Sequence, residues 1–188
     1  MTRRVFGRPF LPAAAAVLAG ALAVAGCHNG SHADEKDAVR NALNSSKLYS
    51  VNPSQDRYKG VITLTGNVDS DDLKSQAEAV AKQAAPDYII ANEIAVRPTG
   101  AESQASAVSS NLDSAIEHNF KASIKAHKNL DQQSIHYSVK NGTLVLKGTV
   151  KTDDQKREAE SLAKQVPNVQ QVVNELEVKP KKHSSAMS

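Results

Sequence analysis

Hydrophobic and polar residues alternate in two stretches of the chain that lie 82 residues apart. Each stretch places three apolar side chains at even spacing, namely Ile62, Leu64 and Val68 in the first and Leu144, Leu146 and Val150 in the second. A period of two puts such side chains on one face of a β-strand. Gly66 and Gly148 interrupt that face at the same point, which indicates a bend in the strand or a closely packed helix. The chain therefore contains two copies of one unit.

A pattern with helical spacing follows each of these strands. In the second copy Thr152 and Gln155 form a helix-start signal, and four apolar positions lie on one side of the expected helix: Ala159, Leu162, Ala163 and Val166. Each helix is expected to end before Pro86 or Pro167, and a last strand should run through residues 90–96 or 172–178. In the second copy, Asn141-Gly142 predicts a tight hairpin turn after a strand over residues 135–139.

A further helix is expected before each hairpin, over residues 37–46 in the first copy and 110–129 in the second. Each copy then has the order αββαβ, and a sheet with both helices on one face would bury the alternating side chains. The sequence predicts an α+β protein of two tandem sandwich modules: module 1 (residues 34–97) and module 2 (residues 108–178), joined by a polar linker at residues 98–107. Polar residues at 54–57 predict a weak first strand in module 1.

The N-terminal 26 residues have the pattern of a signal peptide, with three arginines followed by an apolar stretch at residues 11–24. That stretch is shorter than the ~20 residues of a membrane-spanning helix. Val24-Ala25-Gly26-Cys27 resembles the lipobox of bacterial lipoproteins, so Cys27 is the expected lipid-attachment site and residues 27–33 the expected tether. Ordinary secretory cleavage after Ala25 is the alternative. Residues 2–8 fit a twin-arginine export motif or a basic Sec leader equally well.

The arginines of the signal peptide account for the formal net charge of +3, so the rest of the chain is neutral. A nucleic-acid-binding protein would keep a basic excess for phosphate contacts, which argues against that class. The six histidines are scattered, and we expect no metal site. Acidic pairs at residues 71–72 and 153–154 are explained by helix N-termini. Phosphate-binding loops and nucleophile motifs are absent from the sequence, so no catalytic residues, no cofactor and no enzymatic activity are expected.

The first helix of module 2 carries the most informative surface. A helical wheel turns six residues toward the sheet: Leu112, Ala115, Ile116, Ser123, Ala126 and Leu130. Lys121, Lys125 and Lys128 lie together on the opposite side, with Phe120 and Ile124 at the boundary. These five residues are predicted to bind an anionic phospholipid surface, the lysines at headgroups and the apolar pair as a wedge. The alternative is a solvated lysine face with Phe120 and Ile124 in the core.

Several of these patterns resemble the BON domain family, named for bacterial osmotically induced and nodulation proteins. They are the glycine-flanked strands at residues 60–68 and 142–150, the alanine-rich helix after each, and the closing strand around Asn174. Two copies behind a lipobox resemble the dual-BON lipoproteins of the bacterial outer membrane. Asp87 and Asn168 stand where the family commonly has glycine, and both tolerate a left-handed backbone. The resemblance implies envelope attachment, binding of phospholipid or envelope partners, and no catalysis.

Together these observations predict a non-catalytic envelope lipoprotein that docks module 2 on anionic phospholipid. It would support outer-membrane integrity or tolerance of osmotic and envelope stress. His28 after Cys27 favours the outer membrane, facing the periplasm, over retention in the inner membrane. The basic tail at residues 179–188 would add a weak contact or serve as a disordered solubilising end. The alternative function is a periplasmic scaffold that binds envelope proteins or peptidoglycan, and salt-dependent binding distinguishes the two.

Overall fold

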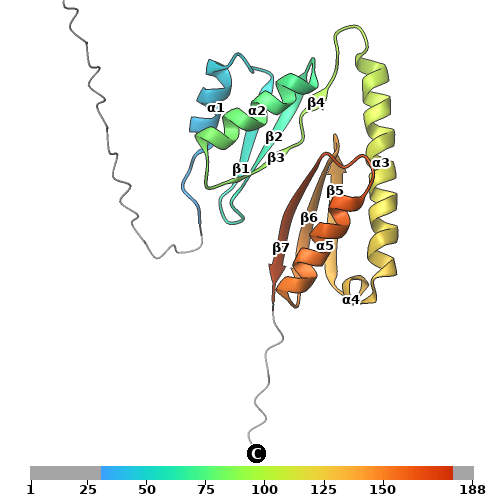
Figure 1. Ribbon diagram of the computed structural model, residues 1–188. Coiled ribbons are helices and arrows are strands. Elements are labelled where there is room, and N and C mark those ends of the chain that lie inside the picture. The colour runs from blue at the N-terminus through green and yellow to red at the C-terminus, as the bar shows by residue number, and fades with distance from the viewer. Residues whose placement is uncertain (1–30, 180–188) are drawn as a thin grey trace, which may run out of the picture.

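The computed structural model describes residues 31–179 (Figure 1). The expected signal peptide, Cys27 and most of the basic tail lie outside the described residues. In the part that is described, no helix is long and apolar enough to span a membrane.

Both copies fold as αββαβ units, as the sequence predicts, except that the last strand of module 1, expected to be continuous over residues 90–96, is divided into two short strands, and a short additional helix follows the first helix of module 2. Module 1 consists of α1 (Lys36–Ser45), β1 (Val51–Asp56), β2 (Val61–Val68), α2 (Asp71–Ala84), β3 (Ile89–Asn92) and β4 (Ala95–Val96). Module 2 consists of α3 (Glu102–Ala126), α4 (Lys128–Asp131), β5 (Ser134–Lys140), β6 (Thr143–Val150), α5 (Asp153–Gln165) and β7 (Gln171–Val178). In each module the hairpin is antiparallel and the last strand pairs in parallel with the middle strand.

Local sequence signals fix the ends of the crossover helices α2 and α5. The hydroxyl of Ser70 accepts a hydrogen bond from the backbone N–H of Leu73 at 3.3 Å. The hydroxyl of Thr152 accepts one from Gln155 at 3.2 Å. Such N-caps satisfy donors that have no partner within the helix. Both helices end before the expected prolines, and the chain then returns to the sheet in parallel.

Each module has its own apolar core between its helices and one face of its sheet. The core of module 1 is centred on Val39, Leu43, Ile62, Leu64, Ala77, Ala81 and Ile94. The core of module 2 is centred on Ile116, Phe120, Leu130, Leu144, Leu146, Ala159, Ala163 and Leu176. The even-numbered strand positions that alternate in the sequence are therefore the residues that face the helices.

The two glycines on these faces are required by the neighbouring strand. Gly66 and Gly148 have φ angles of +129° and +113°. A Cβ atom at either position would collide with a backbone carbonyl oxygen, that of Ser50 or that of Ser134. The expected close approach is thus made by the adjacent strand and not by a helix.

Three sequence-based expectations are corrected by the structure. The strand expected to be weak, β1, is regular and pairs with β2 along its full length despite Pro53. Residues 102–107, expected within the linker, form the first turns of α3. The helix expected to reach residue 129 ends at Ala126, and the chain then turns at His127 into the short helix α4.

The α3 face that packs on the sheet also differs from the expected one. Ile116, Phe120 and Ile124, spaced four residues apart, are its buried residues. Leu112 is 41% exposed, and Ala115 and Ala126 are exposed as well.

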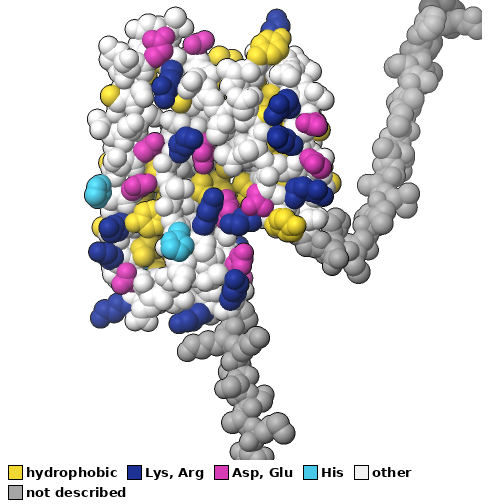
Figure 2. All heavy atoms as spheres, turned by 180° about the vertical axis from the view of Figure 1, so that it is seen from behind, with side chains coloured by type: hydrophobic (Ala, Val, Ile, Leu, Met, Phe, Trp, Pro, Cys, Tyr) yellow, Lys and Arg dark blue, Asp and Glu magenta, His cyan; other side chains and the backbone are white. Residues whose placement is uncertain are grey.

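The helix-free faces of the two sheets meet each other, a contact that no local sequence pattern predicts. One residue from each of four strands forms a small apolar cluster there: Val61, Ala91, Val145 and Val173. Figure 1 shows the resulting layers, with the helices of each module on the outside and the two sheets between them. In the space-filling view of Figure 2, apolar side chains are visible at the seam with charged groups around them.

Candidate functional site

The three predicted lysines lie at the C-terminal end of α3 and in α4. Lys121, Lys125 and Lys128 are all exposed. In the described part of the chain none of the three forms an ion pair with a carboxylate. Their charges are therefore available to an anionic ligand.

Two of these lysines border a shallow depression of about 180 Å³. Lys121 and Lys125 form part of its rim, and its apolar lining comes from α3, α4 and β5: Ile124, Leu130, Ile135 and Tyr137. The carboxylate of Asp131 also lies on the rim, whereas Lys128 is outside the depression. Burial, with a smaller contribution from Glu117, raises the pKa of Tyr137 above its ordinary value, so its hydroxyl remains neutral and can donate a hydrogen bond at physiological pH.

The prediction that Phe120 and Ile124 wedge into a membrane is wrong for this structure. The side chain of Phe120 is fully buried and packs edge-on against Tyr137, with ring centroids 5.0 Å apart. Ile124 is 8% exposed and forms part of the depression's floor. The physical reason is that four-residue spacing from Ile116 carries both side chains onto the face of α3 that packs on the sheet. This agrees with the alternative interpretation, in which Phe120 and Ile124 belong to the core.

Asp113 of α3 has a structural role. Its carboxylate oxygens accept hydrogen bonds from the backbone N–H groups of Asn141 and Gly142 at 2.8 and 2.9 Å. Asn141 and Gly142 form the β5–β6 turn with left-handed φ angles of +49° and +80°. The Asp113 carboxylate therefore stabilises this turn.

A second polar site lies between the modules, where a cavity of about 260 Å³ is lined by residues of both. Lys74 of α2 is only 8% exposed, and its ammonium group donates to the carbonyl oxygen of Asn141 at 2.7 Å and to the amide oxygen of Gln170 at 3.0 Å. Burial lowers the pKa of Lys74, partly opposed by Asp71, Asp113 and Glu78.

Neutral hydrogen bonds complete this junction. The side-chain amide of Gln171 donates to the carbonyl oxygen of Ile90 at 2.9 Å and accepts from the backbone N–H of Asn92 at 2.8 Å. The Thr143 hydroxyl donates to the Asn92 carbonyl oxygen at 2.6 Å. Most polar groups around the cavity therefore already have hydrogen-bond partners. These hydrogen bonds hold the two modules together.

Sequence reasoning missed Lys74 and Gln171 entirely. A signal for part of the network was present, because Asn92 and Asn174 match across the duplication. In both modules the asparagine side chain donates to the backbone of a lysine in the crossover helix, Lys74 at 3.0 Å or Lys156 at 3.2 Å. The shared pattern identifies a contact between the last strand and the crossover helix of the same module. It does not reveal that Lys74, unlike Lys156, is buried by the other module.

Metal-binding geometry is not present in the described residues 31–179, where no group of three or more His, Cys, Asp or Glu side chains could hold an ion. The lipid-attachment prediction at Cys27 and the tail residues 180–188 fall outside this range. Lys179 is described, and its ammonium group pairs with Glu177 at 3.1 Å.

These features define a tandem α+β protein, in which two αββαβ modules pack through their sheets and module 2 carries a cationic helix end. The model of the BON domain matches the chain at residues 33–98 and 112–180. The chain belongs to the BON domain family, and it carries two of these domains. The family is associated with phospholipid or with the cell envelope.

The family's glycine before the last strand is replaced differently in the two modules. Asn168 adopts the expected left-handed backbone with a φ angle of +68°. Asp87 is not among the described residues with positive φ, so module 1 forms this turn in another conformation.

One relative among curated proteins is an uncharacterized protein in the gshII 5' region of Anaplasma centrale. It is 32% identical over 126 residues, which cover 66% of this chain and 80% of the relative. Two solved structures of CdsD, a structural protein of the type III secretion system of Chlamydia trachomatis, are also similar. The first is 14% identical with a TM-score of 0.30 and covers 79% of this chain, which spans 63% of that structure. The second is its C-terminal domain, 16% identical, with a TM-score of 0.28 and coverage of 77% and 67%.

Proposed function

We propose that this protein is a non-catalytic envelope lipoprotein that docks on anionic phospholipid through module 2. The observation that carries the proposal is the lysine-bordered depression at the end of α3. Lys121 and Lys125 have no carboxylate partner in the described chain, and the surface between them has an apolar floor. An anionic headgroup with the start of its acyl region has the matching combination of charge and apolar surface.

The strength expected of this contact is modest. Each lysine near an anionic membrane contributes about 1 kcal/mol, and a carboxylate such as Asp131 reduces the total. Figure 2 shows Lys and Arg side chains around the lower end of module 2, so the attraction extends beyond the depression itself. Binding of this size becomes useful when the protein is already held at the membrane.

A lipid at Cys27 would supply that attachment. An acyl anchor raises the local concentration of headgroups around the modules, so weak and reversible docking suffices. The proposed location is the outer membrane, facing the periplasm, and the proposed biological role is support of outer-membrane integrity during osmotic or envelope stress. Membrane-fraction mass spectrometry tests the anchor, because acylation adds a defined mass to a peptide that begins at Cys27.

Sedimentation with lipid vesicles tests the docking. The mature chain without an anchor is mixed with vesicles of phosphatidylglycerol and phosphatidylcholine, or of phosphatidylcholine alone, at low and at high salt. The proposal expects binding to the anionic vesicles alone, and it expects that binding to fade as salt screens the lysines. Binding that is equal for both vesicles or insensitive to salt would contradict it. That result would favour the alternative, a scaffold for envelope proteins or peptidoglycan.

A further inference from the structure

The first described residues are docked along the β1–β2 turn of module 1. The backbone N–H of His32 donates to the carbonyl oxygen of Arg57 at 2.9 Å, and Arg57 Nε donates back to the carbonyl oxygen of His32 at 2.9 Å. The Gln55 side-chain amide donates to the Ala33 carbonyl oxygen at 2.8 Å. These hydrogen bonds hold the segment before α1 against the end of the β1–β2 hairpin.

The side chain of His32 has a place of its own in this turn. Its ring packs on Tyr88, with ring centroids 5.1 Å apart. Gly60 leaves the necessary space, because a Cβ atom there would collide with the imidazole. Gly60 also has a φ angle of +64°, which glycine adopts without strain. Module 1 is therefore shaped to receive the segment that leads to Cys27.

The tip of the same turn exposes an aromatic side chain. Tyr58 is 84% exposed, the highest value among the large hydrophobic side chains of the described chain, and Ile89 beside it is 46% exposed. Both border a groove of about 250 Å³ together with Lys59. The Asp56 carboxylate accepts hydrogen bonds from the backbone N–H groups of Tyr58 and Lys59 at 3.0 and 3.1 Å, so the turn that presents the tyrosine is fixed.

The chain between this turn and Cys27 is short. From Cys27 to His32 there are five residue steps, which span at most about 18 Å when fully extended. Because His32 is bonded to Arg57, the residue next to Tyr58, an acyl chain on Cys27 would keep this end of module 1 close to the bilayer surface. The opposite end of β1 would point away from it.

We propose that Tyr58 and Ile89 form a second membrane contact, which enters the headgroup region of the bilayer that holds Cys27 and orients module 1 with its β1–β2 turn toward the lipid. This inference rests on the proposed anchor at Cys27. Tyrosine suits the position because its ring is apolar and its hydroxyl is hydrated, the combination enriched at membrane interfaces. Lys59 pairs with Glu175, so the contact is proposed to rest on the apolar surface of Tyr58 and Ile89 and not on the charge of Lys59.

The two proposed membrane contacts lie at ends of the modules that are directed the same way. Figure 1 shows the β1–β2 turn of module 1 and the α3–α4 end of module 2 both directed downward, with the turn at a higher level than the α3–α4 end. The sheet-to-sheet junction and the Lys59–Glu175 ion pair hold the two modules in this arrangement.

Single-tryptophan fluorescence tests the inference. The chain contains no tryptophan, so Tyr58→Trp introduces one reporter, and Tyr49→Trp provides a matched control. Tyr49 is 71% exposed and lies before β1, at the end of the module opposite Tyr58. The mature chain, residues 27–188, is coupled through its one cysteine, Cys27, to a maleimide lipid in vesicles whose acyl chains are brominated. The described fold begins after Cys27, so this chain keeps all of it.

The expected result is a blue shift and strong bromine quenching for Tyr58→Trp, with neither for Tyr49→Trp. Equal quenching of the two variants, or quenching of neither, would overturn the inference. Circular dichroism confirms the fold of both variants. Coupling to a maleimide lipid makes the test independent of acylation in cells, and zwitterionic vesicles make it independent of the lysines. The test can therefore fail for this contact while the proposed function holds, and it can succeed while the proposed function fails.

Discussion

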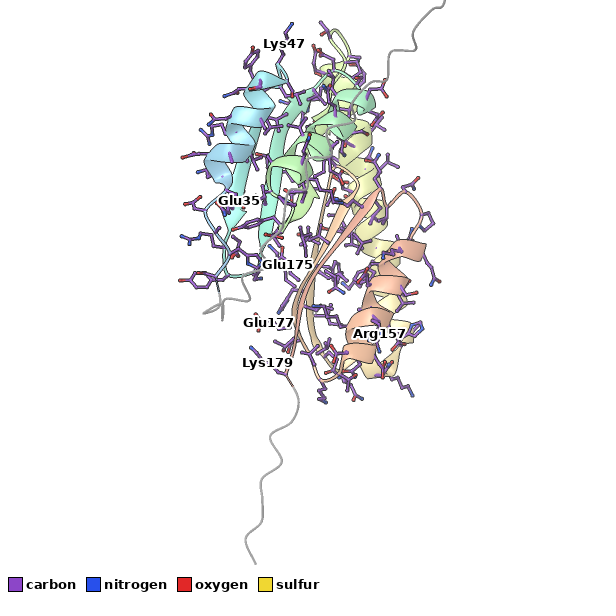
Figure 3. All side chains as sticks on the ribbon, turned by 60° about the vertical axis from the view of Figure 1, so that its left-hand side comes forward. Glu35, Lys47, Arg157, Glu175, Glu177 and Lys179 are labelled. Carbon is purple, nitrogen blue, oxygen red and sulfur yellow. The ribbon has the colours of Figure 1, made fainter. Side chains whose placement is uncertain are left out.

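The ammonium group of Lys59 lies 2.9 Å from the carboxylate of Glu175 and joins module 1 to module 2. Figure 3 shows Glu175 on β7 where the two modules meet, with Glu177 farther along the strand and Lys179 just past its end. The equivalent positions 82 residues away, Asn141 and Glu93, are also in contact, through a hydrogen bond of 2.8 Å from the Asn141 side chain to the Glu93 carbonyl oxygen. The two modules thus contribute equivalent residues to their junction, as the two subunits of a two-fold symmetric dimer do.

Replacing Lys59 should weaken the protein in a pH-dependent way. The hydrogen bond to Glu175 raises the pKa of Lys59 above 10.5, so its stabilisation is complete below pH 10.5 and is lost as the pH rises through the raised value. We expect Lys59→Met to cost about 1 kcal/mol at pH 9 and nearly nothing at about pH 12. Urea unfolding of both proteins at the two pH values measures this difference. A cost that does not change with pH would contradict the role of the ion pair.

Lys74→Met should loosen the junction because it leaves the Asn141 carbonyl oxygen and the Gln170 amide without their donor. The expected loss is about 1–3 kcal/mol of unfolding free energy. Lys156→Met at the equivalent position of module 2 is the control and should change stability by less than about 1 kcal/mol, since the Lys156 side chain has no hydrogen bond in the described structure. Thermal or urea unfolding compares the two, and equal losses would argue against the junction role of Lys74.

Val173→Asp should separate the modules without unfolding them. Val173 is 1% exposed in the apolar cluster at the junction, and a carboxylate there would have no partner. Because each module has its own core, the far-ultraviolet circular dichroism should be retained while the radius of gyration from small-angle X-ray scattering increases. Val108→Asp, at a side chain that is 58% exposed, should leave the radius of gyration unchanged. A compact Val173→Asp variant would show that another contact holds the modules.

Gly148→Ala should be strongly destabilising. Its Cβ would collide with the Ser134 carbonyl oxygen at a φ angle of +113°, so strand β5 would have to move away from β6. We expect a loss of more than about 3 kcal/mol. Gly100→Ala has a φ angle of +84° but nothing near its Cβ, so it reports backbone strain alone and should lose about 1 kcal/mol. Chemical denaturation measures the unfolding free energy of both variants. Similar losses would mean that strand β5 shifts at little cost to make room for the new Cβ atom.

The fold within each module was predictable because its signals are local. Alternation at Ile62 and Leu64, the cap at Thr152 and the turn at Asn141-Gly142 each concern residues close together in the chain. The junction was not predictable, since Val61 and Val173 are ordinary strand residues, and the apolar cluster to which both belong joins distant parts of the sequence.

The candidate site was predicted in part. Lys121 and Lys125 could be placed on the exposed side of the helix from spacing alone. The assignment of Phe120 failed because α3 has apolar residues around much of its circumference, including the exposed Leu112 and Ala115, so the wheel centred the buried face on the wrong residues. Leu130 reaches the core from α4 after the turn at His127, which a continuous helix cannot represent.

The most direct test of phospholipid docking is charge reversal on module 2 with a matched reversal on module 1. The variant Lys121→Glu/Lys125→Glu/Lys128→Glu is compared with Arg40→Glu/Lys47→Glu/Lys82→Glu, which changes the net charge equally at exposed positions of module 1. Sedimentation with anionic vesicles should show that the module 2 variant no longer binds, while the module 1 variant binds nearly as well as the parent. Equal retention or equal loss of binding in the two variants would contradict docking through the end of α3.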